Sequence, residues 1–231
     1  MLRLGITGTD TAVGKTVVAA AVLALLRKRG LRVAAMKPVD TGVVRGSPES
    51  DAVRLGRAAG ARVPSEDICP VMLPDALAPM AAAARAGTEI DLAVIDGAFE
   101  RLSAGRDAVV VESTGGLLSP LSARTAFDDL FQHWRLDALI VAANRLGAIN
   151  HTMLTVEAAR SAGLRVRAVV LHAIHGGEPS LAEETNEATL RALLDDVPIV
   201  SFPWVSDPRD VAALAGVVDA CGLSALLDVN D

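Results

Sequence analysis

Residues 8–16 combine glycines, a lysine and hydroxyl side chains at a spacing that suits phosphate binding. The segment reads GTDTAVGKT, follows an apolar stretch and precedes residues that favour a helix. Glycines allow backbone N–H groups to curl around phosphate oxygens, and the N-terminus of the following helix adds a favourable dipole. Lys15 would supply a positive charge to the β- and γ-phosphates, and the Thr16 hydroxyl would ligate Mg²⁺. We therefore expect a phosphate-binding loop of the P-loop type.

This loop departs from the common P-loop spacing. Five residues, rather than four, separate Gly8 from Gly14, so the usual pattern would place a glycine at Thr9. The alternative interpretation is a strand-to-helix turn that carries Gly-Lys-Thr by chance. A preceding strand and a following helix are the context that a P-loop requires, and this context favours a functional loop.

Two acidic residues have positions that suit a bound metal ion. Glu112 follows the apolar residues 108–111, and we expect it to end a strand beside the phosphate loop. Asp51 lies at the start of an expected helix, where the alternative is an Asp that only complements the helix dipole. Mg²⁺ prefers oxygen ligands and usually keeps several waters. Thr16, Asp51 and Glu112 would therefore form a plausible set of protein ligands.

A second lysine follows another expected strand. Lys37 precedes Pro38, which prevents the strand from continuing, so the lysine should be held near the edge of the sheet. The alternative is an ordinary surface lysine. Thr41 and Gly42 continue this segment with a hydroxyl group and a flexible backbone position.

The remaining sequence alternates between strand-like and helix-like segments. Apolar and β-branched runs predict strands at residues 2–7, 33–36, 108–111, 138–142, 166–171 and 197–201. Helices are expected at residues 16–29, 50–60, 82–85, 92–102, 151–161, 181–194 and 209–221. This alternation predicts a mostly parallel central sheet with helices on both faces. The length fits a single α/β domain over residues 1–231, and the loop at residues 8–16 indicates the P-loop NTPase class.

Four polar segments follow expected strands on the same side of this sheet. They are residues 8–16, 37–41, 112–116 and 144–150. In an open parallel sheet, ligands bind at the carboxyl ends of the strands. The sequence therefore predicts one ligand site to which all four segments contribute.

The composition argues against several other classes of protein. The 231-residue chain has a net charge of -6 and no block of basic residues, so we expect no nucleic-acid binding. Hydrophobic residues make up 51% and aromatic residues 3%, which predicts a core of small aliphatic side chains. The two cysteines lack disulfide or metal-ligand spacing, and no segment reads as a signal peptide or a membrane span. We therefore expect a cytoplasmic protein with no membrane partner.

Together these motifs resemble those of dethiobiotin synthetases, and the resemblance runs over nearly the whole chain. The matching segments are residues 8–16, 37–42 (KPVDTG), 50–52 (SDA), 111–116, 120–121 and 146–155 (LGAINHTMLT). The longer phosphate loop is the form that this family uses. The resemblance implies an ATP-dependent ligase that requires Mg²⁺. In the implied reaction, 7,8-diaminopelargonate and CO₂ form a carbamate, the carbamate attacks the γ-phosphate of ATP, and the neighbouring amine closes the ring of dethiobiotin.

The resemblance also implies roles for individual residues. The implied nucleotide-binding residues are Asp10, Thr11, Ala12, Val13, Gly14, Lys15, Thr16, Val17, His172, Pro203 and Trp204. The implied substrate-binding residues are Lys37, Thr41, Gly115, Gly116, Gly147, Ala148, Ile149 and Asn150. The implied catalytic residues are Lys37, Lys15 and Thr11, and the implied Mg²⁺ ligands are Thr16, Asp51 and Glu112. In the family, segment 147–150 reaches the site from the partner subunit, so a homodimer is implied.

The chain departs from the family near both expected ligands. Ser113 and Thr114 stand where relatives have Gly and Ala, which predicts either a shifted diamine or a different substrate. His172 stands where relatives often have Asn near the nucleotide base, which leaves the base preference open.

Two other functions fit the same motifs. A regulatory or partitioning ATPase would share the loop and the sheet and would use ATP to switch partners. Asn150 and His151, and the lack of a basic or amphipathic tail, argue against this function. A related ligase that forms an amide through another acyl phosphate would suit the departure at Ser113 and Thr114.

Overall fold

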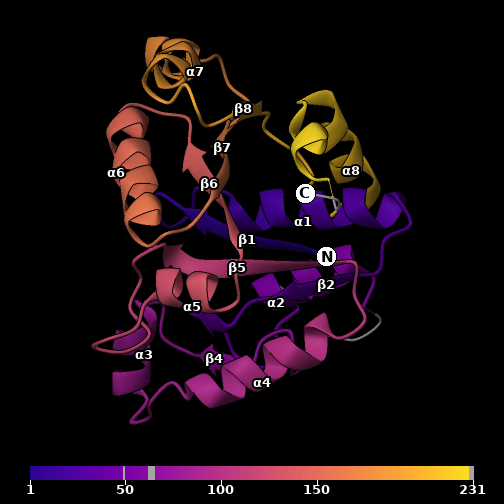
Figure 1. The fold of residues 1–231 in the computed structure, drawn as a ribbon, viewed down its shortest axis with the longest axis vertical. Helices are drawn as coiled ribbons and strands as arrows, with labels where there is room; N and C mark the ends of the chain where they lie inside the picture. The colour runs from indigo at the N-terminus through magenta and orange to yellow at the C-terminus, as the bar shows by residue number, and fades with distance from the viewer. Residues whose placement is uncertain (49, 62–65, 229–231) are drawn as a thin grey trace.

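A six-stranded sheet forms the centre of the fold, and all neighbouring strands described in it are parallel (Figure 1). The computed structural model describes residues 1–48, 50–61 and 66–228. The strands are β1 (Leu2–Gly8), β2 (Val33–Met36), β5 (Ala108–Gly116), β6 (Asp137–Ala143), β7 (Val166–His172) and β8 (Ile199–Phe202). Their order is β2-β5-β1-β6-β7-β8. This sheet confirms the α/β fold class predicted from the sequence.

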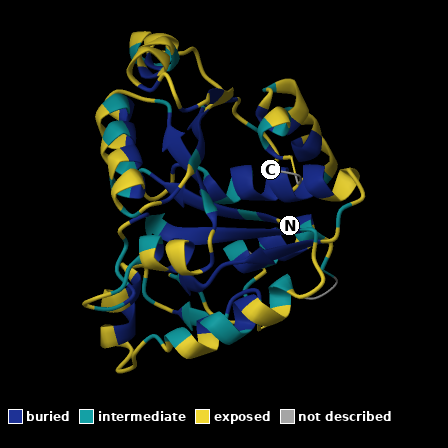
Figure 2. Ribbon diagram, viewed as in Figure 1, coloured by how far each residue is buried: buried dark blue, intermediate teal, exposed yellow. Residues whose placement is uncertain are grey.

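Helices cover both faces of the sheet. In the described part of the chain they are α1 (Lys15–Lys28), α2 (Asp51–Ala59), α3 (Pro79–Arg85), α4 (Leu92–Ser103), α5 (Phe127–His133), α6 (Ala148–Ser161), α7 (Leu181–Leu193) and α8 (Val211–Ala220), followed by the 3₁₀ turn η1 (Leu223–Leu226). Successive side chains of a strand point to opposite faces. Val110 of β5 packs in the cluster with α1 and α8, whereas Val109 and Val111 pack in the cluster with α4, α5 and α6. The sheet is therefore buried on both faces (Figure 2).

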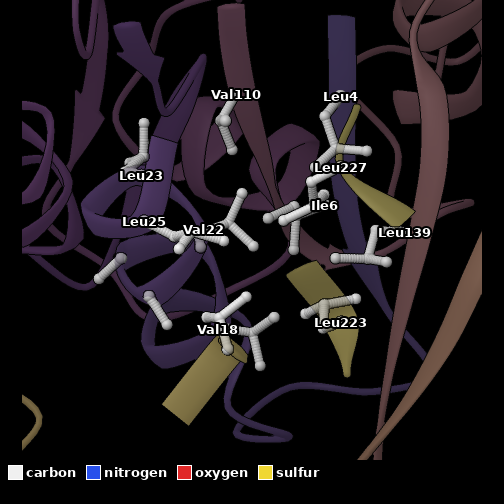
Figure 3. Packing of buried hydrophobic residues seen from close by; sticks show 14 of the residues in the cluster. Leu4, Ile6, Val18, Val22, Leu23, Leu25, Val110, Leu139, Leu223 and Leu227 are labelled. Atoms are coloured by element: carbon white, nitrogen blue, oxygen red, sulfur yellow. The ribbon is translucent and has the colours of Figure 1, made fainter. Parts of the chain in front are cut away.

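Helix α1 is buried along most of its length, which fixes the end of the phosphate loop. Residues 18–26 are all buried, because the sheet covers one side of α1 while α2 and α8 pack against others. Val18 and Val22 share a cluster of aliphatic side chains with Leu4 and Ile6 of β1 (Figure 3). A helix that is apolar on nearly all sides requires such an environment. The N-terminus of α1 is thus held rigidly at the end of β1.

Most predicted elements are confirmed, with boundaries that move by a few residues. Ser50 caps α2 as predicted, because its Oγ accepts a hydrogen bond from the Val53 N–H at 3.3 Å. Helix α6 begins at Ala148 rather than near His151, because Gly147 adopts a φ of 92° and starts the helix earlier. No helix among the described residues has both the length and the apolarity to cross a membrane.

The prediction that Glu112 ends its strand is wrong. The expected strand 108–111 continues as β5 to Gly116, so Glu112 lies within the strand. Glu112 pairs with Ile6 of β1, and Gly116 pairs with Gly8. Ser113 and Thr114 can continue the strand because their hydroxyl groups form hydrogen bonds inside the protein. Their polar side chains alone had suggested that the strand ends before them.

A second, two-stranded parallel sheet was not anticipated. It pairs β3 (Val39–Thr41) with β4 (Val71–Leu73), and three-residue strands give too short a pattern to recognise. This small sheet holds the chain that follows β2. The Lys37 N–H donates to the Ile68 carbonyl at 2.7 Å, and the Gly42 N–H donates to the Asp75 carbonyl at 3.1 Å. The segment that carries Lys37 is therefore anchored at both ends.

Replacing Gly5 by Ala should destabilise the fold, because a Cβ at this position in β1 would overlap the ring of Phe131. Overpacking of this kind costs about 1–3 kcal/mol of unfolding free energy. Gly216 offers a matched control, since it lies in α8 and a Cβ there meets no neighbouring atom. Gly216→Ala should stabilise by up to about 1 kcal/mol. Urea unfolding measures both changes, and equal midpoints for the two variants would contradict this packing.

Candidate functional site

The phosphate loop connects the end of β1 to the start of α1. Gly14 precedes α1 with a φ of 94°, and Ala12 has a φ of 57°. Left-handed residues let successive N–H groups line one concavity, which suits an anion. The Lys15 ammonium donates to the Asp10 carbonyl across the loop at 2.9 Å. The loop therefore presents a lysine and a helix N-terminus at the same place.

His172 of β7 packs against the back of this loop. Its Nδ1 lies 3.0 Å from the Val13 carbonyl, and its ring stands edge-on to Phe202 with centroids 5.6 Å apart. A Cβ at Gly14 would overlap the histidine ring, so only glycine fits there. Burial lowers the pKa of His172, which keeps the ring neutral at pH 7. This residue therefore contacts the loop and is not among the residues that line the adjacent pocket.

Lys37 lies buried among carboxylates at the centre of the site. Its Nζ lies 2.6 Å from Glu112 Oε1 and 3.0 Å from Asp51 Oδ2. The Thr16 hydroxyl donates to the same Glu112 oxygen at 2.9 Å. Four segments therefore meet at this point: Lys37 just after β2, Glu112 of β5, Thr16 in the first turn of α1 and Asp51 in the first turn of α2. The predicted lysine, Lys37, and the predicted carboxylates of Asp51 and Glu112 therefore lie in contact at the edge of the sheet.

Charges within this cluster change one another's proton affinity. Burial lowers the pKa of Lys37, but Glu112 and Asp51 outweigh burial, so the pKa lies above its ordinary value. Burial raises the pKa of Asp51, but Lys37 outweighs it and the pKa lies below its ordinary value. Burial raises the pKa of Glu112, and Lys37 offsets only part of that rise. Burial, helped by the charge of Lys37, lowers the pKa of Lys15 to about 8. Lys37 is therefore the firmly charged lysine of the pair.

The oxygen atoms of this cluster fit a divalent cation such as Mg²⁺. Thr16, Asp51 and Glu112 offer only oxygen donors, the kind that Mg²⁺ prefers. Glu112 Oε2 is buried and has no hydrogen-bond partner among the described residues, so this carboxylate has an unused acceptor. In the part of the chain that the structure describes, no group of three or more His, Cys, Asp or Glu could hold a metal. A cation here would therefore need the hydroxyl, phosphate oxygens or waters to complete its ligands.

Two adjoining pockets border the loop and the lysine cluster. The first has a volume of about 330 Å³, and its lining includes Thr11, Lys15, Thr16, Lys37, Thr41, Asp51 and Glu112. The second has a volume of about 510 Å³ and shares Thr11, Thr41, Thr114 and Gly115 with the first. Its other walls include Gly116 and residues 76–79. Together they offer one compartment rich in charge and another with an apolar wall.

Ser113 and Thr114 turn their hydroxyl groups into the protein. Ser113 is fully buried, and its Oγ donates to the Thr7 hydroxyl at 3.0 Å. Thr114 Oγ1 donates to the Val39 carbonyl. Both residues therefore join β5 to neighbouring strands. Thr114 still borders both pockets, whereas Ser113 is not among the residues that line them.

Segment 147–150 lies apart from these two pockets within a single chain. None of its residues lines either pocket. Gly147 starts α6 without a side-chain cap, so the first turn offers N–H groups to an anion. Three apolar side chains are exposed along the chain around this segment: Leu146 just before α6 at 87%, Leu154 within α6 at 62% and Leu118 just after β5 at 60%. A further pocket of about 370 Å³ runs from Gly116 to Leu154.

Pro203 and Trp204 follow β8 and are absent from the lining of both pockets. Trp204 is 45% exposed and packs beside Gly176, where a Cβ would approach its ring to 2.8 Å. The neighbouring Phe202 carbonyl accepts a hydrogen bond from the Ala173 N–H at 2.9 Å. These two residues therefore stand on the His172 side of the loop.

Asp40 borders the site, although it is not among the residues predicted from the sequence to act there. It is 4% exposed, borders the first pocket, and its Oδ2 is buried with no hydrogen-bond partner among the described residues. Burial raises its pKa, and the charge of Lys37 opposes that rise. A carboxylate three residues after Lys37, inside a segment already recognised, was the signal that could have identified it.

Comparison with known sequences groups the chain with a family of ATP-dependent enzymes. The family model described as an AAA domain matches residues 3–207. The ATP-dependent dethiobiotin synthetase BioD of Anaeromyxobacter dehalogenans (strain 2CP-C) is 43% identical, over 95% of this chain and 98% of its own. The protein of the same name from Ralstonia nicotianae is 36% identical, over 95% of this chain and 96% of its own.

Comparison with solved structures supports the P-loop NTPase fold. Apo McdA from Cyanthece has a TM-score of 0.55 at 16% identity, covering 98% of this chain and 95% of that chain. A ParA family ATPase from Chlorobium tepidum TLS has a TM-score of 0.52 at 13% identity, with coverage of 98% and 95%. At such low identity these structures establish the fold alone.

Replacing Gly14 by Ala should weaken triphosphate binding by at least about tenfold. A left-handed residue with a side chain costs about 1–2 kcal/mol, and here the Cβ would also displace the loop from His172. Gly30→Ala is the control, because Gly30 has a similar φ of 80° but a Cβ there meets no atom. Calorimetric titration with a magnesium nucleoside triphosphate measures both affinities. Unchanged affinity of the Gly14 variant would show that the loop tolerates the side chain.

Proposed function

This chain belongs to the dethiobiotin synthetase family, and we propose that it uses ATP to join 7,8-diaminopelargonate and CO₂ into the ureido ring of dethiobiotin. The observation that carries this proposal is the position of Lys37. It borders the same pocket as Lys15 and Thr16 of the phosphate loop, and Thr41 connects that pocket to the second one. A lysine at this place can contact two anions that must approach each other.

The proposed reaction has three chemical steps. One amine of the diamine adds to CO₂ and loses a proton, which gives a carbamate. A carbamate oxygen attacks the γ-phosphorus of ATP, ADP leaves, and a carbamic–phosphoric anhydride forms. The second amine then attacks the carbonyl carbon, inorganic phosphate leaves, and the ring closes with loss of a proton. Repulsion between the carbamate and the triphosphate opposes the second step, so positive charge at their junction should accelerate it.

Three side chains of this protein would lower that repulsion. Lys15 would contact the β- and γ-phosphates from the loop, and Lys37 would lie between the carbamate and the γ-phosphate. Thr11 borders both pockets, so its hydroxyl could donate to the transferred phosphoryl group. Holding nucleophile and phosphorus in adjoining pockets would also remove part of the entropic barrier. A bound Mg²⁺ would neutralise further phosphate charge, and its proposed protein ligands are Thr16, Asp51 and Glu112.

We place the diamine in the second pocket. Thr41, Gly115 and Gly116 border this pocket, and residues 76–79 (ALAP) offer an apolar wall for the alkyl chain. Glycines allow the backbone to approach the reacting nitrogens closely. Because the Ser113 side chain faces away from this pocket, we propose that the departure at that position leaves the substrate class unchanged.

We propose a homodimer in which the partner's segment 147–150 binds the substrate carboxylate. The support is that this segment lies outside both pockets of its own chain, although its helix N-terminus suits an anion. Leu118, Leu146 and Leu154 are exposed nearby, and a dimer that buried them would remove apolar surface from water.

We propose ATP as the nucleotide. Residues 10–17 would bind its phosphates, and its base would lie on the side of His172, Pro203 and Trp204. His172 is buried with its Nδ1 beside the Val13 carbonyl, whereas Trp204 is exposed, so the indole of Trp204 is the better supported contact for a purine. We also propose that residues 1–231 act as one domain in the cytoplasm, where the free thiols of Cys69 and Cys221 would stay reduced.

The two alternative functions have weaker support. McdA and the ParA family ATPase resemble this chain in fold alone, whereas the synthetases resemble it in sequence over nearly their full length. An amide ligase with another substrate was suggested by Ser113 and Thr114, and both hydroxyls are turned into the protein.

Phosphate release in the presence of the diamine, bicarbonate and MgATP tests the proposal. Lys37→Met should lower kcat by about 10²–10³-fold, because it removes a charge aimed at the transition state while keeping the aliphatic stem. Lys28→Met is the control, since Lys28 is a surface lysine with 64% of its side chain exposed. Circular dichroism should verify that both variants fold. ATP hydrolysis that does not depend on the diamine would refute the proposed function.

The Ser113→Gly variant tests whether Ser113 changes how the protein binds the diamine. This substitution introduces the glycine that the family resemblance implies at this position, and it should leave the KM for the diamine within about twofold of the unsubstituted protein. The loss of the Thr7 contact should lower the unfolding free energy by about 1 kcal/mol. Steady-state kinetics and urea unfolding measure the two effects. A large fall in the KM for the diamine would mean that Ser113 had shifted the substrate site.

A further inference from the structure

Lys37 has no hydrogen-bond donor left for a ligand in this structure. An ammonium group carries three N–H donors. The Nζ atom has three acceptors around it: Glu112 Oε1 at 2.6 Å, Asp51 Oδ2 at 3.0 Å and the Ser113 carbonyl at 3.4 Å. The proposed function requires this same ammonium group to contact the reacting anions. It can do so only after it gives up at least one of these three contacts.

The two carboxylates that hold Lys37 are the same ones that suit the divalent cation. Glu112 Oε1 accepts from both the Lys37 ammonium and the Thr16 hydroxyl, and Asp51 contributes the other carboxylate. Like charges brought together at a buried site repel strongly. A divalent cation bound by both carboxylates would therefore push the ammonium group away from them.

The backbone at Lys37 is held in place, so only its side chain can move when a metal binds. The Lys37 N–H is held by the Ile68 carbonyl at 2.7 Å, and Pro38 follows directly. Lys37 itself borders the first pocket together with Thr11 and Thr41, and its ammonium group sits at the end of a four-carbon stem. Rotation about the bonds of the stem can carry the ammonium group from the carboxylates toward that pocket without moving β2.

We propose that Lys37 acts as the resident cation of the metal site, so that the ammonium group and Mg²⁺ exclude each other from Glu112 and Asp51. Binding of the metal releases Lys37 into the pocket where the reacting anions meet. Without the metal, the two carboxylates hold this lysine away from the anions. The inference rests on the proposed function, which identifies the metal ligands and the anions that Lys37 contacts. It adds that the metal binds before Lys37 reaches those anions.

Metal affinity in the absence of nucleotide and substrate tests this exchange. Mn²⁺ can replace Mg²⁺ as the probe, and its binding is measured by electron paramagnetic resonance. Lys37→Met should bind Mn²⁺ at least about tenfold more tightly than the unsubstituted protein, because the competing cation is gone. Lys28→Met should bind as the unsubstituted protein does. Lys15→Met, which removes a nearby charge that does not touch the carboxylates, should have a smaller effect than Lys37→Met.

Three results would overturn the proposal. One is equal Mn²⁺ affinity of Lys37→Met and the unsubstituted protein. Another is an equal gain in Lys15→Met and Lys37→Met, which would indicate a diffuse effect of charge. The third is no metal uptake by any of these proteins. None of these measurements uses the diamine, so the exchange can fail while diamine-dependent turnover succeeds, and the reverse.

The unsubstituted protein offers a second measurement that does not depend on the folding of a variant. The chain contains only three lysines, Lys15, Lys28 and Lys37. Labelling with ¹³C-lysine therefore gives three ε-methylene signals, and Lys28, whose side chain is 64% exposed, serves as the internal reference. Addition of Mg²⁺ should shift the Lys37 signal the most and leave the Lys28 signal unchanged. A Lys37 signal that stays in place with Mg²⁺ present would overturn the proposal.

Discussion

A buried ammonium group held between two carboxylates is the interaction around which the site of this protein is arranged. Lys37 is 2% exposed and Glu112 is 1% exposed, so each charge depends on the other for compensation. Removing one partner of such a pair costs about 3–5 kcal/mol, because the remaining charge stays buried. The pair connects the end of β2 to β5, and Asp51 connects both to α2. One electrostatic contact therefore links elements that the chain supplies from three separate regions.

The order of the strands makes this contact possible. Neighbouring strands β2, β5, β1 and β6 end at the same edge of the sheet. Strands β2, β1 and β6 each lead into a polar segment, and β5 carries the fourth, residues 112–116, at its own end. The register of β1 with β5 sets Ile6 opposite Glu112, which places the carboxylate next to the start of the phosphate loop. Aliphatic packing on both faces keeps that register, because a parallel sheet of this kind is buried on both sides. The chemistry of the site thus depends on core packing that contains no catalytic group.

The same fold occurs in McdA and in a ParA family ATPase, and a fold by itself does not decide function, which resides in sites. In this chain the phosphate loop is the general part of the site. The part that we propose to be specific is the segment after β2, with Lys37, Asp40 and Thr41, together with the glycines at the end of β5, all of which line the two pockets. The small sheet of β3 and β4 holds this specific segment in place.

The sequence by itself determined the phosphate loop, the cap at Ser50, the alternation of strands and helices, and hence the parallel sheet. These features depend on local spacing and hydrophobic periodicity, which a single sequence displays directly. Only the tertiary structure decided that Ser113 bonds Thr7, that His172 supports the loop at Val13, and that Lys37 pairs with Glu112. The partners in these contacts are 106, 159 and 75 residues apart. No local pattern encodes such contacts, because they arise from the order and register of strands that the core selects.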